Sequence, residues 1–133
     1  MKKVFLGGTC NGSNWREELI PKLKIDYFNP VVEDWTEECY QEELIQREKC
    51  DYCLYVITPK MMGVYSIAEV IDDSNKRPEK TIFLFLTKDE DLLHVFNKLQ
   101  IKSLDKVGIM VEKNGGKYFK NEEDLVSFLN GVE

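Results

Sequence analysis

Two glutamates, Glu69 and Glu43, occupy positions from which a carboxylate could do chemistry. Glu69 falls in the first turn of a helix predicted to follow an apolar strand, within the stretch DYCLYVITPKMMGVYSIAEV. The helix dipole and nearby amides favour an anion there, so we expect a lowered pKa and a carboxylate suited to nucleophilic attack. The structural alternative is a capping box, in which Ser66 and Glu69 bind amides at the start of their own helix.

Glu43 lies on a helix that we predict for residues 36–49, with Thr36 as its N-cap. At about 100° per residue, Glu43 and Arg47 fall inside the apolar arc of this helix instead of opposite it. The two residues could form an i,i+4 ion pair at the edge of the buried face. Alternatively, Glu43 points into a polar cleft, where Arg47 keeps it ionised or orients it.

A glycine-rich turn, GGTCNGS at residues 7–13, follows the first apolar run. It matches neither G-x-G-x-x-G nor a P-loop, so binding of NAD or ATP is not predicted. Glycines there let the backbone approach a ligand, and free amides at a helix start favour a phosphate or another anion; a plain turn is the alternative. Trp15 and Arg16 could stack on a base or meet a phosphate, although Trp15 could equally lie in the core.

Strand-like apolar segments alternate with helical ones along the chain. We predict strands at residues 3–8, 25–30, 51–58, 81–87 and 106–113. We predict helices at residues 13–23, 36–49, 66–76, 89–99 and 121–131. This alternation indicates one α/β domain, residues 1–133, with a doubly wound five-stranded parallel sheet of flavodoxin-like order 2-1-3-4-5 and helices on both faces. Ligands bind such sheets beyond the carboxyl ends of the strands, so GGTCNGSNW and TPKMMGVYSIAE are predicted to be neighbours.

The composition favours a small polar ligand over other partners. The formal net charge is −6 and Lys and Arg do not cluster, so we expect no nucleic acid polymer as a partner. No apolar run reaches about 18 residues, so we expect no membrane partner and a cytoplasmic protein. Cys50-Asp-Tyr-Cys53 matches C-x-x-C, but zinc needs further ligands and the chain has one His. We therefore predict two semi-buried thiols, and no metal or cofactor.

Two segments, VFLGGTCNGSNW and YQEELIQREKCDYCLYVITPKMMGVYSIAEV, resemble the nucleoside 2-deoxyribosyltransferase-like family, which includes deoxynucleoside-monophosphate N-glycosidases. The resemblance covers residues 3–85 and implies a flavodoxin-like fold in a homo-oligomer whose neighbouring subunit completes the site. It implies that Glu69 is the nucleophile on C1′ of deoxyribose and that Glu43 holds or protonates the substrate. It also implies a base site lined by Phe5, Gly7 and Gly8.

The loop before Glu69 departs from the family pattern. Transferase members carry an Asp about six residues before the nucleophile, where Gly63 stands here, and VYSIA replaces a glycine-rich approach. Ser66 could bind a phosphate, as a serine near this point does in the monophosphate hydrolases.

We predict N-glycosyl transfer or hydrolysis on 2-deoxynucleosides or their 5′-monophosphates through a covalent glycosyl-Glu69 intermediate. The alternative is a catalytically idle module of the same fold that senses a nucleotide. A flavodoxin-like electron carrier is disfavoured, because the first turn lacks the Ser/Thr-rich loop expected for FMN. Besides the two glutamates, the predicted substrate-binding residues are Phe5, Gly7, Gly8, Thr9, Ser13, Trp15, Arg47, Gly63, Tyr65 and Ser66.

Overall fold

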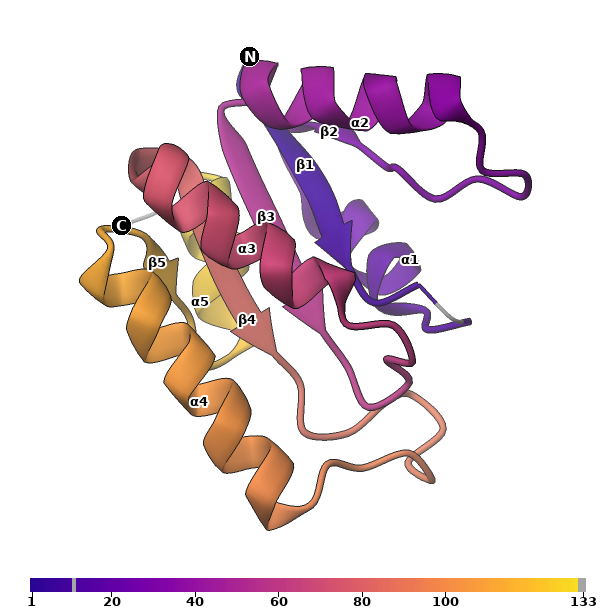
Figure 1. Cartoon of the computed structure of the whole chain (residues 1–133), viewed down its shortest axis with the longest axis vertical. Coiled ribbons are helices and arrows are strands. Elements are labelled where there is room, and N and C mark those ends of the chain that lie inside the picture. The colour runs from indigo at the N-terminus through magenta and orange to yellow at the C-terminus, as the bar shows by residue number, and fades with distance from the viewer. Residues whose placement is uncertain (11, 132–133) are drawn as a thin grey trace.

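Five parallel strands form one sheet in the order β2-β1-β3-β4-β5 (Figure 1), which confirms the predicted fold. The computed structural model describes residues 1–10 and 12–131. The strands are β1 (Lys3–Gly8), β2 (Asp26–Phe28), β3 (Tyr52–Ile57), β4 (Thr81–Phe85) and β5 (Lys117–Tyr118). β1 and β3 lie side by side, with Gly8 opposite Val56, so their carboxyl ends meet at one edge of the sheet.

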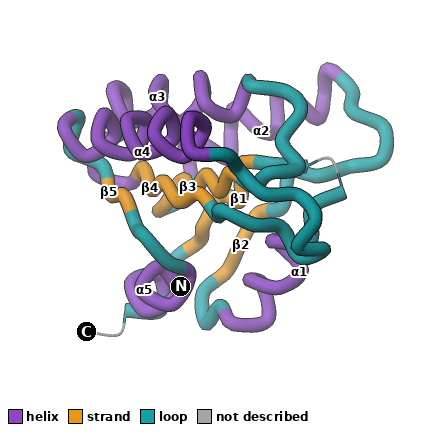
Figure 2. Tube along the Cα trace, turned by 90° about the horizontal axis from the view of Figure 1, so that it is seen from below, coloured by secondary structure: helices purple, strands orange, loops and turns teal. Residues whose placement is uncertain are grey.

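Helices cover both faces of the sheet (Figure 2). One face carries α2 (Glu37–Lys49), α3 (Tyr65–Lys76) and α4 (Lys98–Lys113), and the other carries α1 (Trp15–Leu19) and α5 (Glu122–Leu129). Short 3-10 helices follow α1 and α3, namely η1 (Ile20–Lys22) and η2 (Pro78–Lys80). Thr36 caps α2 as predicted, because its side chain accepts a hydrogen bond from the Cys39 amide. None of the helices in the described part of the chain is long and apolar enough to cross a membrane.

Side chains that alternate along the strands build the two halves of the core. The half on the side of α3 and α4 contains Phe5, Tyr55, Ile57, Phe83, Val70 and Val111. The half on the side of α1 and α5 contains Val4, Leu6, Leu54, Val56, Leu84, Leu19 and Leu125. Because both faces are covered, β3 and β4 are almost entirely apolar, as expected for inner strands of a parallel sheet, and the polar exception is Thr81 at the start of β4.

The predicted helix at residues 89–99 and the predicted strand at residues 106–113 are both wrong. An extended loop with an antiparallel bridge between Lys88 and Val95 takes the place of the first. Helix α4 begins after a capping box made by Asn97 and Gln100 and runs through the second segment. Buried residues recur at helical spacing along α4, so burial of this face outweighs the strand propensity of the run GIMV. The fifth strand is therefore β5.

The predicted helix at residues 13–23 is shorter in the structure. Helix α1 begins at Trp15 and ends at Leu19, where η1 follows with Pro21 in its first turn. Ser13 does not cap α1; its hydroxyl donates a hydrogen bond to the buried carboxylate of Asp89 at 3.0 Å. Ser13 therefore joins the loop after β1 to the loop after β4.

The cysteines of the C-x-x-C segment, Cys50 and Cys53, are buried free thiols. Burial raises the pKa of Cys53 to about 12 and also raises the pKa of Cys50. Both thiols therefore stay protonated near neutral pH, where a redox cysteine would need a thiolate. Their placement agrees with the predicted apolar thiols.

Candidate active site

A cavity of about 590 Å³ lies where β1 and β3 end. Its volume is within the range of small-molecule sites, about 300–1,000 Å³. Both predicted carboxylates contribute to its wall, Glu43 from α2 and Glu69 from α3. The loops after β1 and β3 were predicted to be neighbours, and they are joined by the Thr58 amide, which donates to Thr9 Oγ1 at 2.9 Å.

Phe5, Gly7 and Gly8 form the part of the cavity wall that belongs to β1, and the two glycines allow its close packing. Gly8 has a φ of +117°, and a Cβ there would lie 2.0 Å from the carbonyl oxygen of Val56. A Cβ at Gly7 would lie 2.7 Å from the ring of Tyr55. Glycine is therefore required at both positions for β1 to pack against β3, and it leaves backbone facing the cavity.

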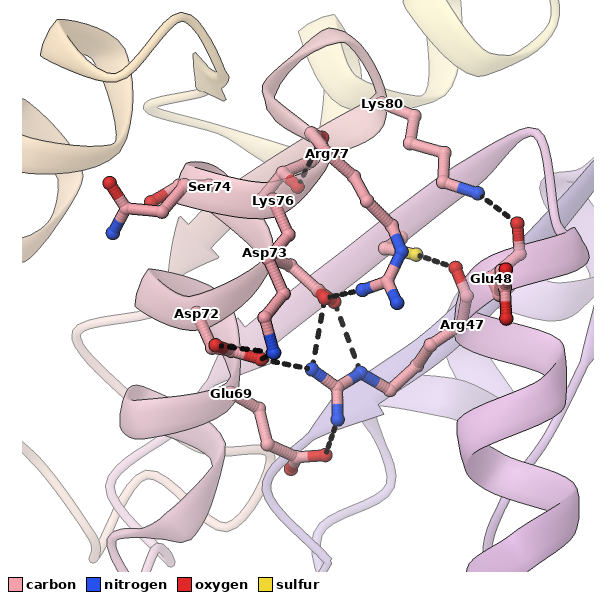
Figure 3. A network of polar contacts seen from close by, with 12 residues as sticks. Arg47, Glu48, Glu69, Asp72, Asp73, Ser74, Lys76, Arg77 and Lys80 are labelled. Atoms are coloured by element: carbon pink, nitrogen blue, oxygen red, sulfur yellow. Dashed lines mark hydrogen bonds and ion pairs between the residues drawn. The ribbon is translucent and has the colours of Figure 1, made fainter.

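Glu69 lines the cavity as the fifth residue of α3, because the helix begins at Tyr65. The predicted capping box is wrong: Val64 is the N-cap, and no side chain among the described residues caps this helix end. The Glu69 carboxylate instead faces the Arg47 guanidinium, with Oε2 3.5 Å from one terminal nitrogen (Figure 3). Only 16% of the Glu69 side chain is exposed. The Glu69 side chain is therefore mostly shielded from bulk water, and its remaining surface belongs to the cavity wall.

Burial raises the pKa of Glu69 to about 7. The positive charge of Arg47 opposes this rise, while the neighbouring carboxylates of Glu43, Asp73 and Asp72 add to it. The predicted lowering of the Glu69 pKa is therefore wrong. Glu69 lies beyond the first helical turn, where the field of the helix end falls off, so desolvation decides the direction.

Glu43 shares the cavity wall with Glu69 but has a different polar partner. The indole nitrogen of Trp35 donates to Glu43 Oε2 at 3.4 Å. Burial raises the pKa of Glu43, and the Trp35 hydrogen bond and the charge of Arg47 partly offset the rise. Among the described residues, no ion pair joins Glu43 to Arg47, which turns to α3. The predicted ion pair is therefore wrong. Glu43 does lie at the cavity, but Trp35 contacts its carboxylate and Arg47 neither contacts it nor prevents the rise in its pKa.

Most of the predicted substrate-binding residues do line this cavity. They are Phe5, Gly7, Gly8, Thr9, Gly63, Tyr65 and Ser66. Three others lie behind the wall. Trp15 is 4% exposed in the core, where its indole donates to the Thr9 carbonyl at 2.8 Å, so its ring cannot stack on a bound base. Ser13 and Arg47 are also buried and bind protein carboxylates.

The segment between β2 and α2 forms a side of the cavity that we did not predict. Its contributions are Pro30, Val31, Val32 and Trp35. The rings of Trp35 and Tyr40 meet edge to face, with centroids 5.4 Å apart. Val31, Val32 and Trp35 are exposed apolar residues. In the sequence they form an apolar stretch just before a helix cap, and this pattern could have indicated a binding surface.

Arg16, considered from the sequence as a possible phosphate ligand, lies in the cavity wall and has a structural role that we did not predict. It is 3% exposed, and its guanidinium donates to the carbonyls of Leu6, Thr9 and Gly8 at 3.0, 2.7 and 3.3 Å. These bonds hold the turn after β1 in shape. Desolvation lowers the pKa of Arg16, but an arginine remains protonated.

Comparison with known protein families matches residues 1–84 to the family described as nucleoside 2-deoxyribosyltransferase like. The matched residues include the turn after β1, both cavity glutamates and strands β1 to β3. No curated protein matches the chain.

Proposed function

Because the chain belongs to the nucleoside 2-deoxyribosyltransferase like family, we propose that it transfers or hydrolyses the N-glycosidic bond of 2-deoxynucleosides or their 5′-monophosphates. Glu69 is the nucleophile in this proposal. The observation that carries it is the position of the Glu69 carboxylate, which is mostly buried in the wall of a cavity at the carboxyl ends of β1 and β3. Open-sheet α/β proteins bind ligands at this place.

In the first step, an ionised oxygen of Glu69 forms a bond to C1′ of the sugar while the bond from C1′ to the base nitrogen breaks. The bonding electrons leave with the base, which takes up a proton, and a glycosyl ester remains on Glu69. In the second step, water or another base attacks C1′ from the face that the first base left and gives up a proton to solvent or to Glu43. The ester bond breaks, the Glu69 carboxylate is restored, and the configuration at C1′ is retained.

Glu43 is suited to a different role from Glu69. Burial raises its pKa, so its carboxyl takes up a proton more readily than an ordinary glutamate does, and a protonated carboxyl can donate to a sugar hydroxyl or to the leaving base. The Trp35 indole donates a long hydrogen bond of 3.4 Å to Glu43 Oε2, which restrains the carboxyl weakly and leaves it able to turn towards a substrate. We propose that Glu43 binds or protonates the substrate and that Tyr65 and Trp35 offer aromatic surface to the base.

The pKa of Glu69 near 7 makes the proposed first step dependent on pH. The nucleophile must be ionised, so base release should rise with pH up to about 7 and level off above it. Below this midpoint the rate should fall about tenfold for each pH unit, as the ionised fraction does.

The decisive experiment is incubation of the protein with a panel of deoxynucleosides and their 5′-monophosphates, with free base measured by chromatography. We expect base release from at least one substrate, and its loss in Glu69→Gln. Glu48→Gln is the matched control, because it removes an exposed carboxylate from α2 outside the cavity. A 2-deoxy-2-fluoro nucleoside should leave its sugar attached to the peptide that contains Glu69. No base release and no adduct across the panel would refute the proposal.

Gly63 favours a second candidate, an idle module of this fold that binds a nucleotide without turning it over. The resemblance to family transferases implies an Asp at this position. Gly63 lines the cavity there instead and supplies no carboxylate. Calorimetric titration with Glu69→Ala separates the two functions. An idle module binds the ligand and releases no base in the unsubstituted protein, whereas an enzyme loses turnover on substitution and keeps its affinity.

We also propose that the protein assembles as a homo-oligomer. Val64 and Tyr65, next to the cavity, are 68% and 60% exposed, and an adjoining subunit could cover this apolar surface. Light scattering after gel filtration tests the assembly, and a monomer at all protein concentrations would contradict it.

A further inference from the structure

A buried arginine, Arg47, lies directly behind Glu69 and joins α2 to α3 (Figure 3). Its side chain is 6% exposed, although arginine is rarely buried without paired charges. Three carboxylates of α3 surround its guanidinium, those of Glu69, Asp72 and Asp73. The feature is therefore an ion cluster between two helices, in which Glu69 is the member that lines the cavity.

Asp73 holds Arg47 more firmly than Glu69 does. Two guanidinium nitrogens contact both oxygens of Asp73, with distances of 3.2 and 2.9 Å, in a two-pronged arrangement. Asp73 is fully buried, and it also accepts hydrogen bonds from the Tyr55 hydroxyl at 2.5 Å and from Arg77. These contacts from β3 and from the end of α3 fix Asp73, and Asp73 in turn fixes the guanidinium plane.

Glu69 meets the remaining side of this fixed cation. The third guanidinium nitrogen lies 3.5 Å from Glu69 Oε2, at the limit of a hydrogen bond. A bond of this length restrains the carboxylate weakly but leaves the full charge of Arg47 close to it. The carboxylate is therefore free to approach a ligand, and its charge still depends on Arg47.

We propose that Arg47 is a positioning residue for Glu69: Asp73 fixes the place of the Arg47 cation, and this cation determines how readily the Glu69 carboxylate beside it ionises. The part of this inference that treats Glu69 as a nucleophile rests on the proposed function. Arg47 stabilises the ionised form of Glu69. Asp73 limits that effect because it holds the Arg47 guanidinium against its own carboxylate and away from Glu69. No contact between Arg47 and the substrate is required, because Arg47 does not line the cavity.

Other charged groups also face Glu69 and act in the opposite direction to Arg47. Glu43 faces it from α2, and Asp72 and Asp73 face it from α3; each raises its pKa. Arg47 is the cation that contacts Glu69 within the described part of the chain, and it offsets part of the cost of burial. Removing Arg47 and removing Asp73 should consequently move the ionisation of Glu69 in opposite directions.

The test is a carbon-13 NMR titration of glutamate carboxyls in the full chain, with the Glu69 signal assigned by its loss in Glu69→Gln. In Arg47→Met, the Glu69 midpoint should rise by at least about one pH unit, because a cation within about 4–6 Å is lost. In Asp73→Asn, the midpoint should fall, because an anion is lost and Arg47 can move towards Glu69. A purely structural role would lower the stability of both variants without moving the midpoint in opposite directions.

Circular dichroism first identifies which variants fold. Arg47→Lys replaces Arg47→Met if that variant does not fold, because a lysine cannot contact Asp73 and Glu69 with separate prongs, so the midpoint should again rise. Asp72→Asn, at a side chain 45% exposed, replaces Asp73→Asn in the same way and should lower the midpoint by less. An unchanged Glu69 midpoint in the variants that fold would overturn the inference.

Activity measurements separate this inference from the proposed function. If the unsubstituted protein releases base, the pH profile of base release should move with the NMR midpoint in each variant. If it releases none while the NMR midpoints move as expected, the enzyme proposal fails and the effect of Arg47 on the Glu69 charge stands.

Discussion

Glu69→Gln should stabilise the folded protein at pH 8 and have little effect at pH 5. Burial raises the pKa of Glu69 from the ordinary 4.5 to about 7, so the folded state holds the proton more tightly than the unfolded state does. The stability that this proton contributes is fully present below about pH 4.5 and is lost as the pH rises to about 7. At about 1.4 kcal/mol for each pH unit, the ionised carboxylate costs up to about 3 kcal/mol above pH 7. A neutral glutamine avoids that cost.

Urea unfolding followed by tryptophan fluorescence measures this effect at both pH values, since Trp15 is buried in the core. We expect the unfolding free energy of Glu69→Gln to exceed that of the unsubstituted protein by about 2–3 kcal/mol at pH 8, and by much less at pH 5. Glu48→Gln, at an exposed position of α2, should show no such difference between the two pH values. A Glu69→Gln variant that is less stable at pH 8 would refute the reasoning, because Arg47 would then contribute more to the folded state than burial of the carboxylate costs.

Three further substitutions test the cavity wall and its support. Gly8→Ala should lose several kcal/mol of unfolding free energy or fail to fold, because its Cβ would overlap the Val56 carbonyl and because alanine is strained at a φ of +117°. A variant as stable as the parent in urea unfolding would be inconsistent with the described β1–β3 contact. Gly63→Asp should keep the stability of the parent, because its Cβ would meet no heavy atom of the described residues within 4 Å. The added carboxylate should move the pH midpoint of base release upward, and a large loss of stability in the same assay would contradict this. Ser13→Ala should lose about 1–3 kcal/mol of unfolding free energy in urea, because the buried Asp89 carboxylate loses a hydrogen-bond donor. An unchanged unfolding free energy would show that this hydrogen bond does not stabilise the protein.

The sheet order and the place of the cavity could be predicted from the sequence because they depend on local patterns and on general rules of connection. Apolar runs such as YCLYVI read as strands covered on both faces, and right-handed connections between parallel strands leave few possible orders. Residues 89–113 were the exception. Short apolar runs such as GIMV fit a strand or a helix equally well, and the cap at Asn97 and the packing of Gly108 against Tyr118 favour the helix.

The sequence by itself indicated Glu69 by its place after an apolar strand and Glu43 by its place in the apolar arc of its helix, and the family resemblance implied that both belong to the site. The tertiary structure alone decided what state they are in and what surrounds them. It placed Trp35 beside Glu43 and Trp15 in the core, and it paired Arg47 with Asp73, a residue 26 positions away. The ionisation of a buried carboxylate depends on lost hydration and on charges from other elements, and a local pattern of residues contains neither.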